Sequence, residues 1–130
     1  IDGVVVAQMI TGGVETILGV NRDPVFGPVV MFGIGGVFVE AFKDVAFRVA
    51  PFGEAEARAM IDEVKGRVML RGLRGAPPAD EAALVRALAQ LSSFAAANAD
   101  VIETIDINPF VVLPAGQGAV ALDALIVTRD

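Results

Sequence analysis

The hydrophobic periodicity of this 130-residue chain changes twice, and these two changes constrain its fold more than any other feature. Up to residue 50, short segments rich in Val, Ile and Phe alternate with turn residues, which is the pattern of β-strands. After Pro51–Gly53 the apolar residues recur at helical spacing, and from residue 103 the strand pattern returns. Strands, two helices and strands in this order predict an α+β fold: a largely antiparallel sheet with two main helices on one face.

Most of the predicted strands are separated by short turns. The breaks at 11–13 and 22–27 contain Gly, Asp and Pro, which suit hairpin loops. We expect strands over 4–10, 14–21, 28–32, 37–42, 45–49, 103–113 and 119–127.

The two predicted helices differ in how clearly their ends are marked. Gly66 is the expected C-terminal cap of the first helix, and the aperiodic, Gly/Pro/Arg-rich stretch 67–79 predicts a long loop after it. Asp80 is a suitable N-cap for the second helix, which should end near 98–100. Their apolar stripes are Ala57, Met60, Ile61 and Val64 in the first helix, and Leu84, Leu88, Leu91 and Ala95 in the second.

The composition excludes several classes of protein. With no Cys and no His, the chain cannot form a disulfide scaffold, a zinc finger, a thiol nucleophile or a His-based acid–base site. Its 16 acidic and 10 basic residues argue against a nucleic-acid partner. The longest uncharged run, Pro24–Val39, is interrupted by Pro and Gly and is shorter than the roughly 18–20 residues of a membrane helix. We therefore expect no membrane partner and a cytoplasmic location.

The domain organisation follows from the length and from the first residues. A chain of this length with 55% apolar residues can bury one core, so residues 1–130 are expected to form a single domain. The chain begins at Ile1 and enters an apolar run almost at once, whereas a natural N-terminus usually starts with polar residues. We therefore expect a fragment of a longer multidomain chain, whose exposed apolar surface would favour a homo-oligomer.

The strongest chemical signal is the segment 103–109. In a strand, Thr104, Asp106 and Asn108 share one face. A four-residue turn at 114–117 gives paired positions that sum to 231, which places Asn108 opposite Asp123. Directly opposed Cβ atoms lie about 4.5–5.5 Å apart. An amide oxygen and a carboxylate at that distance can hold one hard divalent cation.

A plainer interpretation of the same segment stays open. Asp106 and Asn108 could merely solvate the outer face of an edge strand, and a bulge would break the register. The apolar neighbours of Asp123, from Ala121 to Leu125, argue against this interpretation, because an unpaired carboxylate in apolar surroundings is costly.

The glycine cluster 33–36 is less specific. Phe38 stands where the dinucleotide-binding fingerprint needs a third small residue, and the chain contains no P-loop motif. The glycines are either a tight turn between strands or a place where backbone amides approach phosphate.

Single charged residues in these segments also allow two interpretations. Glu15 and Glu40 either face solvent or line a nucleotide cleft. Arg71 and Arg74 either bind an anion or are solvated.

Several short motifs occur in an order that is specific to one family and span nearly the whole chain. They are Gly13–Glu15, Gly19–Pro24, Phe26–Gly33, Gly35–Glu40, Arg74–Asp80, Ile105–Pro109 and Ala121–Ala124. Together they resemble the C-terminal part of the ATP-grasp domain of the NDP-forming acyl-CoA synthetases. This group includes ADP-forming acetate–CoA ligase and is related to the succinyl-CoA synthetase β subunit.

The resemblance implies a role for each matching residue. Asn108 and Asp123 would be Mg²⁺ ligands, in agreement with the pairing above, and Asp106 would approach a phosphohistidine delivered by a mobile segment. The segment Val6–Met9 would be the hinge strand whose backbone contacts adenine. The implied nucleotide-binding residues are Gln8, Met9, Glu15, Gly35, Gly36 and Glu40.

The resemblance also implies a reaction, cofactors and partners. The expected reaction converts acyl-CoA, ADP and phosphate to the carboxylic acid, CoA and ATP through a phosphohistidine, with Mg²⁺ and ATP or ADP bound. The family's N-terminal ATP-grasp subdomain, CoA-binding domain and phosphohistidine are missing from this sequence. We therefore expect half a nucleotide site, inactive alone.

One alternative function is a non-catalytic, ligase-like regulatory domain of a protein acetyltransferase. Retention of Asp106, Asn108 and Asp123 argues against complete loss of the ligase site.

Overall fold

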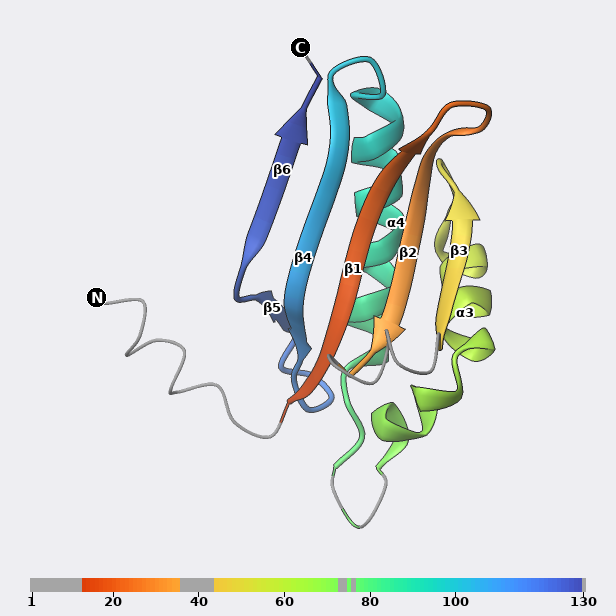
Figure 1. Cartoon of the computed structure of the whole chain (residues 1–130). Coiled ribbons are helices and arrows are strands. Elements are labelled where there is room, and N and C mark those ends of the chain that lie inside the picture. The colour runs from red at the N-terminus through yellow and green to blue at the C-terminus, as the bar shows by residue number, and fades with distance from the viewer. Residues whose placement is uncertain (1–12, 36–43, 73–74, 76, 130) are drawn as a thin grey trace, which may run out of the picture.

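The computed structural model describes residues 13–35, 44–72, 75 and 77–129. The predicted strands 4–10 and 37–42 lie outside this part of the chain. The elements (Figure 1) are β1 (Val14–Asp23), β2 (Gly27–Ile34), β3 (Val45–Val49), α3 (Glu54–Glu63), the 3₁₀ helix η1 (Lys65–Arg71), α4 (Glu81–Ala97), β4 (Ile102–Val112), β5 (Ala119–Ala121) and β6 (Ala124–Thr128).

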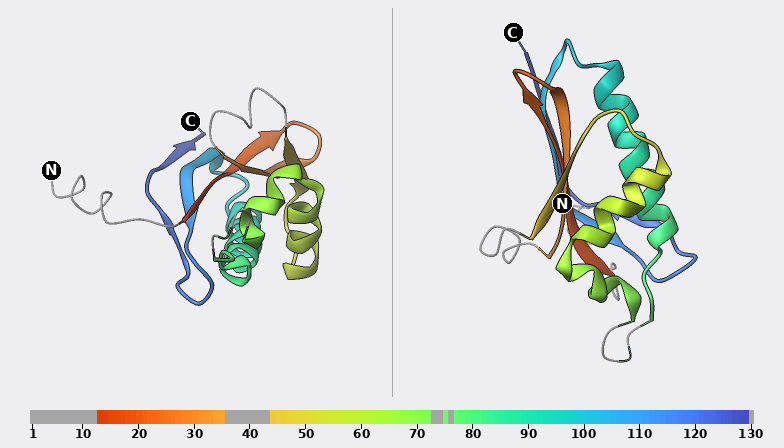
Figure 2. Two further views of the ribbon diagram at one scale, coloured as in Figure 1. Left: turned by 90° about the horizontal axis from the view of Figure 1, so that it is seen from below. Right: turned by 90° about the vertical axis from the view of Figure 1, so that its right-hand side faces the viewer.

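The strands form one sheet in the order β3-β2-β1-β4-β5, and β6 also pairs with β4. All of these pairings are antiparallel. Figure 2 shows α3 and α4 on the same face of the sheet. The predicted α+β fold, with two main helices on one face, is therefore confirmed. No helix in the described part of the chain is long and apolar enough to cross a membrane.

The core lies between the sheet and the helices. Alternate residues of a strand point to opposite faces, so one side chain in two along each strand reaches the helices. The buried core includes Leu18, Val20, Phe32, Ile105 and Phe110 from the sheet, and Met60, Ile61, Leu84 and Leu88 from α3 and α4. Neither α3 nor α4 lies on the other face of the sheet, and among the described residues no helix covers it; this face is called the open face below.

The second predicted helix is confirmed at both ends. The Asp80 carboxylate accepts a hydrogen bond from the Ala83 N–H at 3.2 Å, which is the geometry of an N-cap. At the other end the Asn98 N–H donates to the Phe94 carbonyl at 3.1 Å, and the helix stops.

The chain between the helices differs from the prediction. Gly66 does not cap α3, which ends at Glu63. It lies instead in η1 (Lys65–Arg71), which extends into the first part of the predicted loop 67–79. The Asp44 carboxylate accepts from the Lys65 and Gly66 N–H groups at 2.8 and 2.9 Å, and Leu70 is buried against the core. Both interactions join residues far apart in sequence, so local periodicity gave no sign of them.

The last predicted strand is split in two. Residues 119–127 form β5 and β6, with a break at Leu122–Asp123. The break lies opposite Pro109, which has no N–H to donate to the neighbouring strand. Instead, the Leu122 N–H donates to the Pro109 carbonyl at 3.0 Å.

Candidate functional site

The predicted register between β4 and the last two strands is confirmed. Phe110 pairs with Ala121 on one side of the break, and Ile107 pairs with Ala124 on the other, so both pairs sum to 231. Between them the Asn108 N–H donates to the Asp123 carbonyl at 3.1 Å. The structure therefore places Asn108 opposite Asp123.

A bulge does occur in β4, but it faces the other neighbour. Thr16 pairs with Phe110 and Leu18 pairs with Ile107, so two residues of β4, Asn108 and Pro109, oppose the single residue Ile17 of β1. Because the extra residue is accommodated toward β1, the register toward β5 and β6 is kept through Asn108, and the separate shift toward β6 lies farther along β4, between Ile102 and Thr104. Bulges of this kind often lie beside active sites and redirect a side chain.

The surroundings of Asp123 differ from the expectation. Residues 121–129 are all exposed, so the apolar neighbours do not desolvate this carboxylate, and that argument against a solvated strand is wrong. Asn108 is exposed as well, so the side chains of both residues are accessible to a ligand. Within the described ranges, no three His, Cys, Asp or Glu side chains lie close enough together to hold a metal. A cation at this pair would therefore need further oxygen ligands from a bound molecule.

Asp106 belongs to a row of side chains that crosses the open face. Asp106 is exposed, whereas its neighbours Ile105 and Ile107 pack on the helix side, as the alternation predicts. Cross-strand partners share a face. The row, given strand by strand, is Leu125, Asp106, Gly19, Met31 and Phe47.

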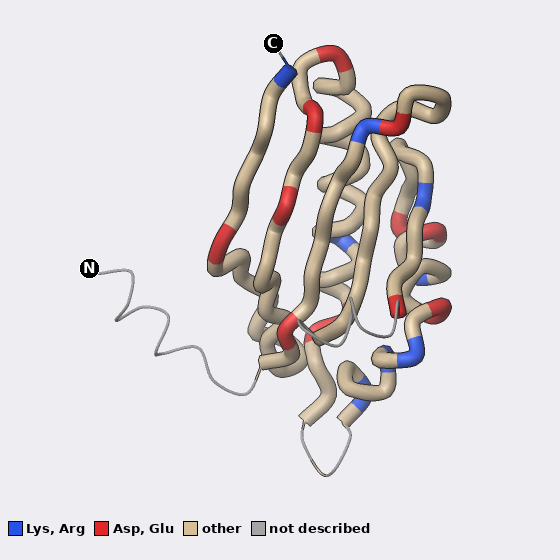
Figure 3. The backbone as a smooth tube through the Cα atoms, in the orientation of Figure 1, with Lys and Arg blue, Asp and Glu red and all other residues tan. Residues whose placement is uncertain are grey.

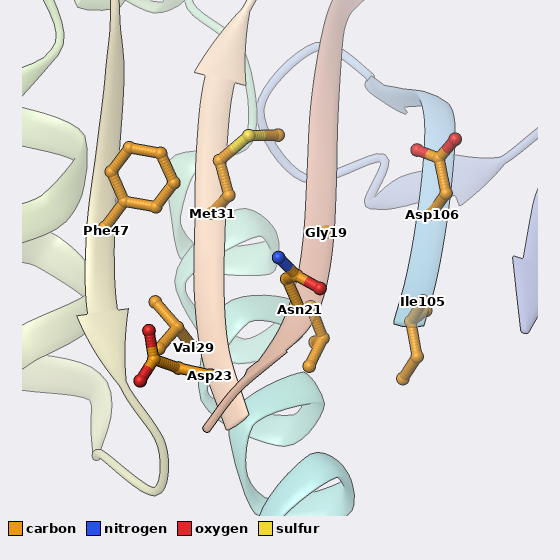
Figure 4. A pocket seen from close by; sticks show the side chains of 9 residues that line it. Gly19, Asn21, Asp23, Val29, Met31, Phe47, Ile105 and Asp106 are labelled. Atoms are coloured by element: carbon orange, nitrogen blue, oxygen red, sulfur yellow. The ribbon is translucent and has the colours of Figure 1, made fainter. Parts of the chain in front are cut away.

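A pocket of about 410 Å³ lies along this row. Figure 4 shows Met31 and Phe47 on one side of it and Asp106 on the other, with Gly19 between them. Gly19 has no side chain, so the middle of the row is open. One wall of the pocket is thus apolar and the opposite wall carries a carboxylate.

The charge near this pocket is negative. Asp23 and Asp106 line it, and none of its lining residues is Lys or Arg. Figure 3 shows acidic positions along β4 and next to β6. The Asp23 carboxylate accepts the N–H groups of Phe26 and Val25, which lowers the pKa of Asp23 below its usual value. A phosphate group in this region would therefore need a cation to offset the repulsion.

Two of the other predicted nucleotide-binding residues lie together. The Gly35 N–H donates to the Glu15 carbonyl at 2.8 Å, and the Glu15 side chain is exposed. Gly35 has a φ of 81°, a region that favours glycine. The predicted residues Gln8, Met9, Gly36 and Glu40, and the hinge 6–9, lie outside the described residues.

Arg71 is held by carboxylates. Its guanidinium forms salt bridges with the carboxylates of Asp62 at 2.9 Å and Glu81 at 3.0 Å. These partners raise the pKa of Arg71 above its usual value. The pairs tie the end of η1 to α3 and α4. Of the two interpretations left open for Arg71, the structure does not favour anion binding. Arg74 lies outside the described residues.

Sequence reasoning missed the pocket on the open face. Its residues Gly19 and Asn21 alternate along β1, and Met31 lies on β2 beside them. The alternation was visible in the sequence, but the partners of β1 were not. Only the pairing of Gly19 with Asp106 brings these residues next to Asp106, the residue predicted to approach a phosphohistidine.

Comparison with known proteins identifies the family. Residues 1–128 match a family model described as an ATP-grasp domain. The chain is 46% identical to the β subunit of the ADP-forming acetate–CoA ligase II of Pyrococcus furiosus, over 99% of this chain and 55% of that relative. It is 40% identical to the ADP-forming 4-hydroxybutyrate–CoA ligase of Nitrosopumilus maritimus, over 97% of this chain and 18% of that relative.

A solved structure shows the same fold. It is acetyl-coenzyme A synthetase 1 of Ca. Korarchaeum cryptofilum in complex with coenzyme A and Mg-AMPPCP. The TM-score is 0.84 at 48% identity, over 90% of this chain and 54% of that chain. The present chain thus spans about half the length of this structure and of the Pyrococcus subunit.

All three of these proteins are named as ligases or synthetases, so the acetyltransferase alternative gains no support from them. Both the sequence match and the arrangement of sheet and helices lead to one family. The chain belongs to the ATP-grasp domain family.

Proposed function

We propose that this chain forms the metal- and nucleotide-binding half of an ADP-forming acyl-CoA synthetase. The observation that carries the proposal is that the register is the same on both sides of the break at Leu122–Asp123, so that Asn108 lies opposite Asp123, with both residues exposed. The complete enzyme would convert acyl-CoA, ADP and phosphate to the acid, CoA and ATP through a phosphohistidine. The similarity to ADP-forming ligases supports this reaction.

Asn108 and Asp123 would hold Mg²⁺, and the site fits that ion. An amide and a carboxylate supply hard oxygen ligands, and Mg²⁺ is commonly held by one or two carboxylates together with phosphate oxygens and water. The bound Mg²⁺ would offset the charge of the nucleotide phosphates next to an acidic strand. The similar Korarchaeum structure is a complex with Mg-AMPPCP, which supports this choice of cation and nucleotide.

Asp106 would orient the phosphohistidine. It lies two residues before Asn108 on β4, a separation of about 7 Å along a strand. A histidine ring held near Asp106 would then be close to the phosphates bound at Asn108. Glu15 and Gly35, with Gln8, Met9, Gly36 and Glu40, are the proposed nucleotide contacts.

The remaining parts of the enzyme would come from outside this chain. The relatives extend well beyond the matched region, in agreement with a single domain, residues 1–130, that works with other domains of a longer cytoplasmic protein. Acetate and 4-hydroxybutyrate ligases resemble the chain to a similar degree. We infer that the acyl group is selected elsewhere.

The test is the affinity for Mg-ADP in the complete synthetase, measured by titration calorimetry with Asp123→Asn. We expect the affinity to fall at least about tenfold, because mutation of groups that only orient metal ligands already lowers metal affinity by about that factor. With Mg²⁺ removed by EDTA, the variant and the parent should bind ADP equally.

Asp100→Asn is the matched control. It makes the same change of charge at an exposed position in the turn before β4, away from Asn108. Mg-ADP affinity should be unchanged in this variant. An Asp123→Asn protein that binds Mg-ADP as well as the parent would refute the assignment of the metal ligands.

A further inference from the structure

The Asp80 carboxylate joins two distant elements. One oxygen accepts the Ala83 N–H and so caps α4. The other accepts the N–H groups of Gly118 at 2.8 Å and Gly116 at 3.2 Å, both in the turn between β4 and β5. These three donors lower the pKa of Asp80 below its usual value, with Gly118 as the largest cause. The carboxylate is therefore bound as an anion by a helix and a hairpin turn at once.

The backbone before α4 lies along the same turn. The Asp80 N–H donates to the Leu113 carbonyl at 2.7 Å, and the Ala115 N–H donates to the Pro78 carbonyl at 2.9 Å. Ala79 forms an isolated antiparallel bridge with Pro114. The turn is thus held from outside by the chain that leads into α4, as well as by its own strands.

The turn needs an unusual backbone. Gly116 and Gly118 have φ values of 85° and 84°, a region that other residues rarely adopt. Asp80 accepts the N–H groups of both glycines and thereby stabilises this one conformation over other turns. In a hairpin, the turn type and loop length fix the register of the two strands.

The register set at this turn continues to the proposed metal ligands. Leu113 and Gly118 are joined by a hydrogen bond of 2.9 Å at the turn, and the same sum of 231 holds as far as Thr104 and Val127. A slip of one residue would move Asp123 away from Asn108 and exchange the faces of β5 and β6. Since residues 121–129 are exposed, core packing does little to prevent such a slip.

We propose that Asp80 is a positioning residue for the metal site: it locks the 114–118 turn to α4 and so keeps Asp123 opposite Asn108. The proposal rests on the proposed function of that pair. α4 can act as the fixed reference because Leu84 and Leu88 anchor it in the core. An Asp80 that only caps the helix would leave the metal site unaffected when its bonds to the turn are lost.

Asp80→Asn separates the two roles. Asn is as good an N-cap as Asp, so the bond from Ala83 can be kept. Asn has only one acceptor oxygen, and its amide N–H groups would face the N–H groups of Gly116 and Gly118. The helix cap is then retained while the link to the turn is lost.

The experiment measures Mn²⁺ binding to the complete synthetase by electron paramagnetic resonance. With Asp80→Asn we expect the affinity for Mn²⁺ to fall about tenfold, as for other groups that orient metal ligands. Amide hydrogen exchange, measured without metal, should become faster at Gly118 and Asn108. Gly118→Ala, which strains the same turn at its own backbone, should likewise weaken Mn²⁺ binding and make exchange at Asn108 faster.

Asn98→Ala is the matched control. It removes a side-chain hydrogen bond at the opposite end of α4, from Asn98 to the Phe94 carbonyl at 2.8 Å. Mn²⁺ affinity and exchange at Asn108 should not change. If this control weakens Mn²⁺ binding as much as Asp80→Asn does, the effect is general loosening of α4 and the proposal is overturned.

The outcomes separate this proposal from the one on which it rests. Unchanged Mn²⁺ affinity in Asp80→Asn and Gly118→Ala, with a loss in Asp123→Asn, would overturn the role of Asp80 alone. Unchanged affinity in Asp123→Asn would overturn the metal site itself. If Asp80→Asn does not fold, Gly118→Ala decides the matter.

Discussion

Gly19 provides a sharp test of the sheet geometry at the pocket. It lies in the middle of β1 and pairs with Asp106 on one side and Met31 on the other. A Cβ added at this position would meet the Ile105 carbonyl oxygen at 3.4 Å and the Met31 Cε at 3.6 Å. These are ordinary van der Waals contacts. The position therefore accepts a methyl group without a shift of the strands, and Gly19→Ala should stabilise the protein.

The magnitude follows from two contributions. Replacing Gly by Ala without strain stabilises a protein by about 0.4–1 kcal/mol, because the unfolded chain loses conformational freedom. Packing of the methyl group adds a fraction of the roughly 0.8 kcal/mol of a fully buried CH₂, because the pocket is open to solvent. We expect a gain of about 1 kcal/mol in the free energy of unfolding, or an increase of about 4 °C in Tm for a chain of this size.

The assay is thermal unfolding followed by far-UV circular dichroism, since the chain has no Trp or Tyr for fluorescence. Gly66→Ala is the contrasting variant. Its Cβ would meet the Ile34 Cβ at 3.1 Å, and that atom is fixed to the β2 backbone. Overpacking of this kind costs about 1–3 kcal/mol. If Gly19→Ala lowers the Tm as Gly66→Ala does, the pairing that places Gly19 beside Asp106 and Met31 is wrong.

Two further predictions concern α4. Leu84 is completely buried, so Leu84→Ala should reduce the free energy of unfolding by about 2–5 kcal/mol, measured by urea denaturation; a smaller loss would contradict its place in the core. The pKa of Asp80 is lowered in the folded protein, so its stabilising effect is present above the unfolded value near 3.8 and is lost as the pH falls through the folded pKa. Below pH 3.8 the free energy of unfolding should therefore fall less steeply with decreasing pH in Asp80→Asn than in the parent. The same dependence on pH in both proteins would show that this carboxylate does not contribute.

Local signals in the sequence were sufficient for most elements. Strands 14–23, 27–34 and 45–49, and the helix that begins after Asp80, each contain their own evidence in side-chain alternation, helical spacing or a capping residue. The register between β4 and the last strands also follows from local information, because a four-residue turn fixes which residues are opposite.

Other features depend on residues far apart in sequence. η1 forms because Asp44 binds its first two N–H groups and Leu70 packs in the core. The bulge at Asn108–Pro109 is defined only against β1, and the break in the last strand depends on the missing N–H of Pro109. None of these has a periodic pattern that a single segment could reveal.

The candidate site divides in the same way. The sequence alone predicted that Asn108 and Asp123 are opposed, which the register confirms, and that Asp106 lies on the opposite face from Ile105 and Ile107, since turn length and alternation are short-range properties. Only the tertiary structure decided that Gly19, Met31 and Phe47 complete a pocket beside Asp106, that Asp123 is exposed to water, and that Asp80 holds the hairpin turn. The physical reason is that strand pairing, solvent exposure and contacts between a helix and a turn arise when distant segments meet, and no short stretch of chain encodes its neighbours in space.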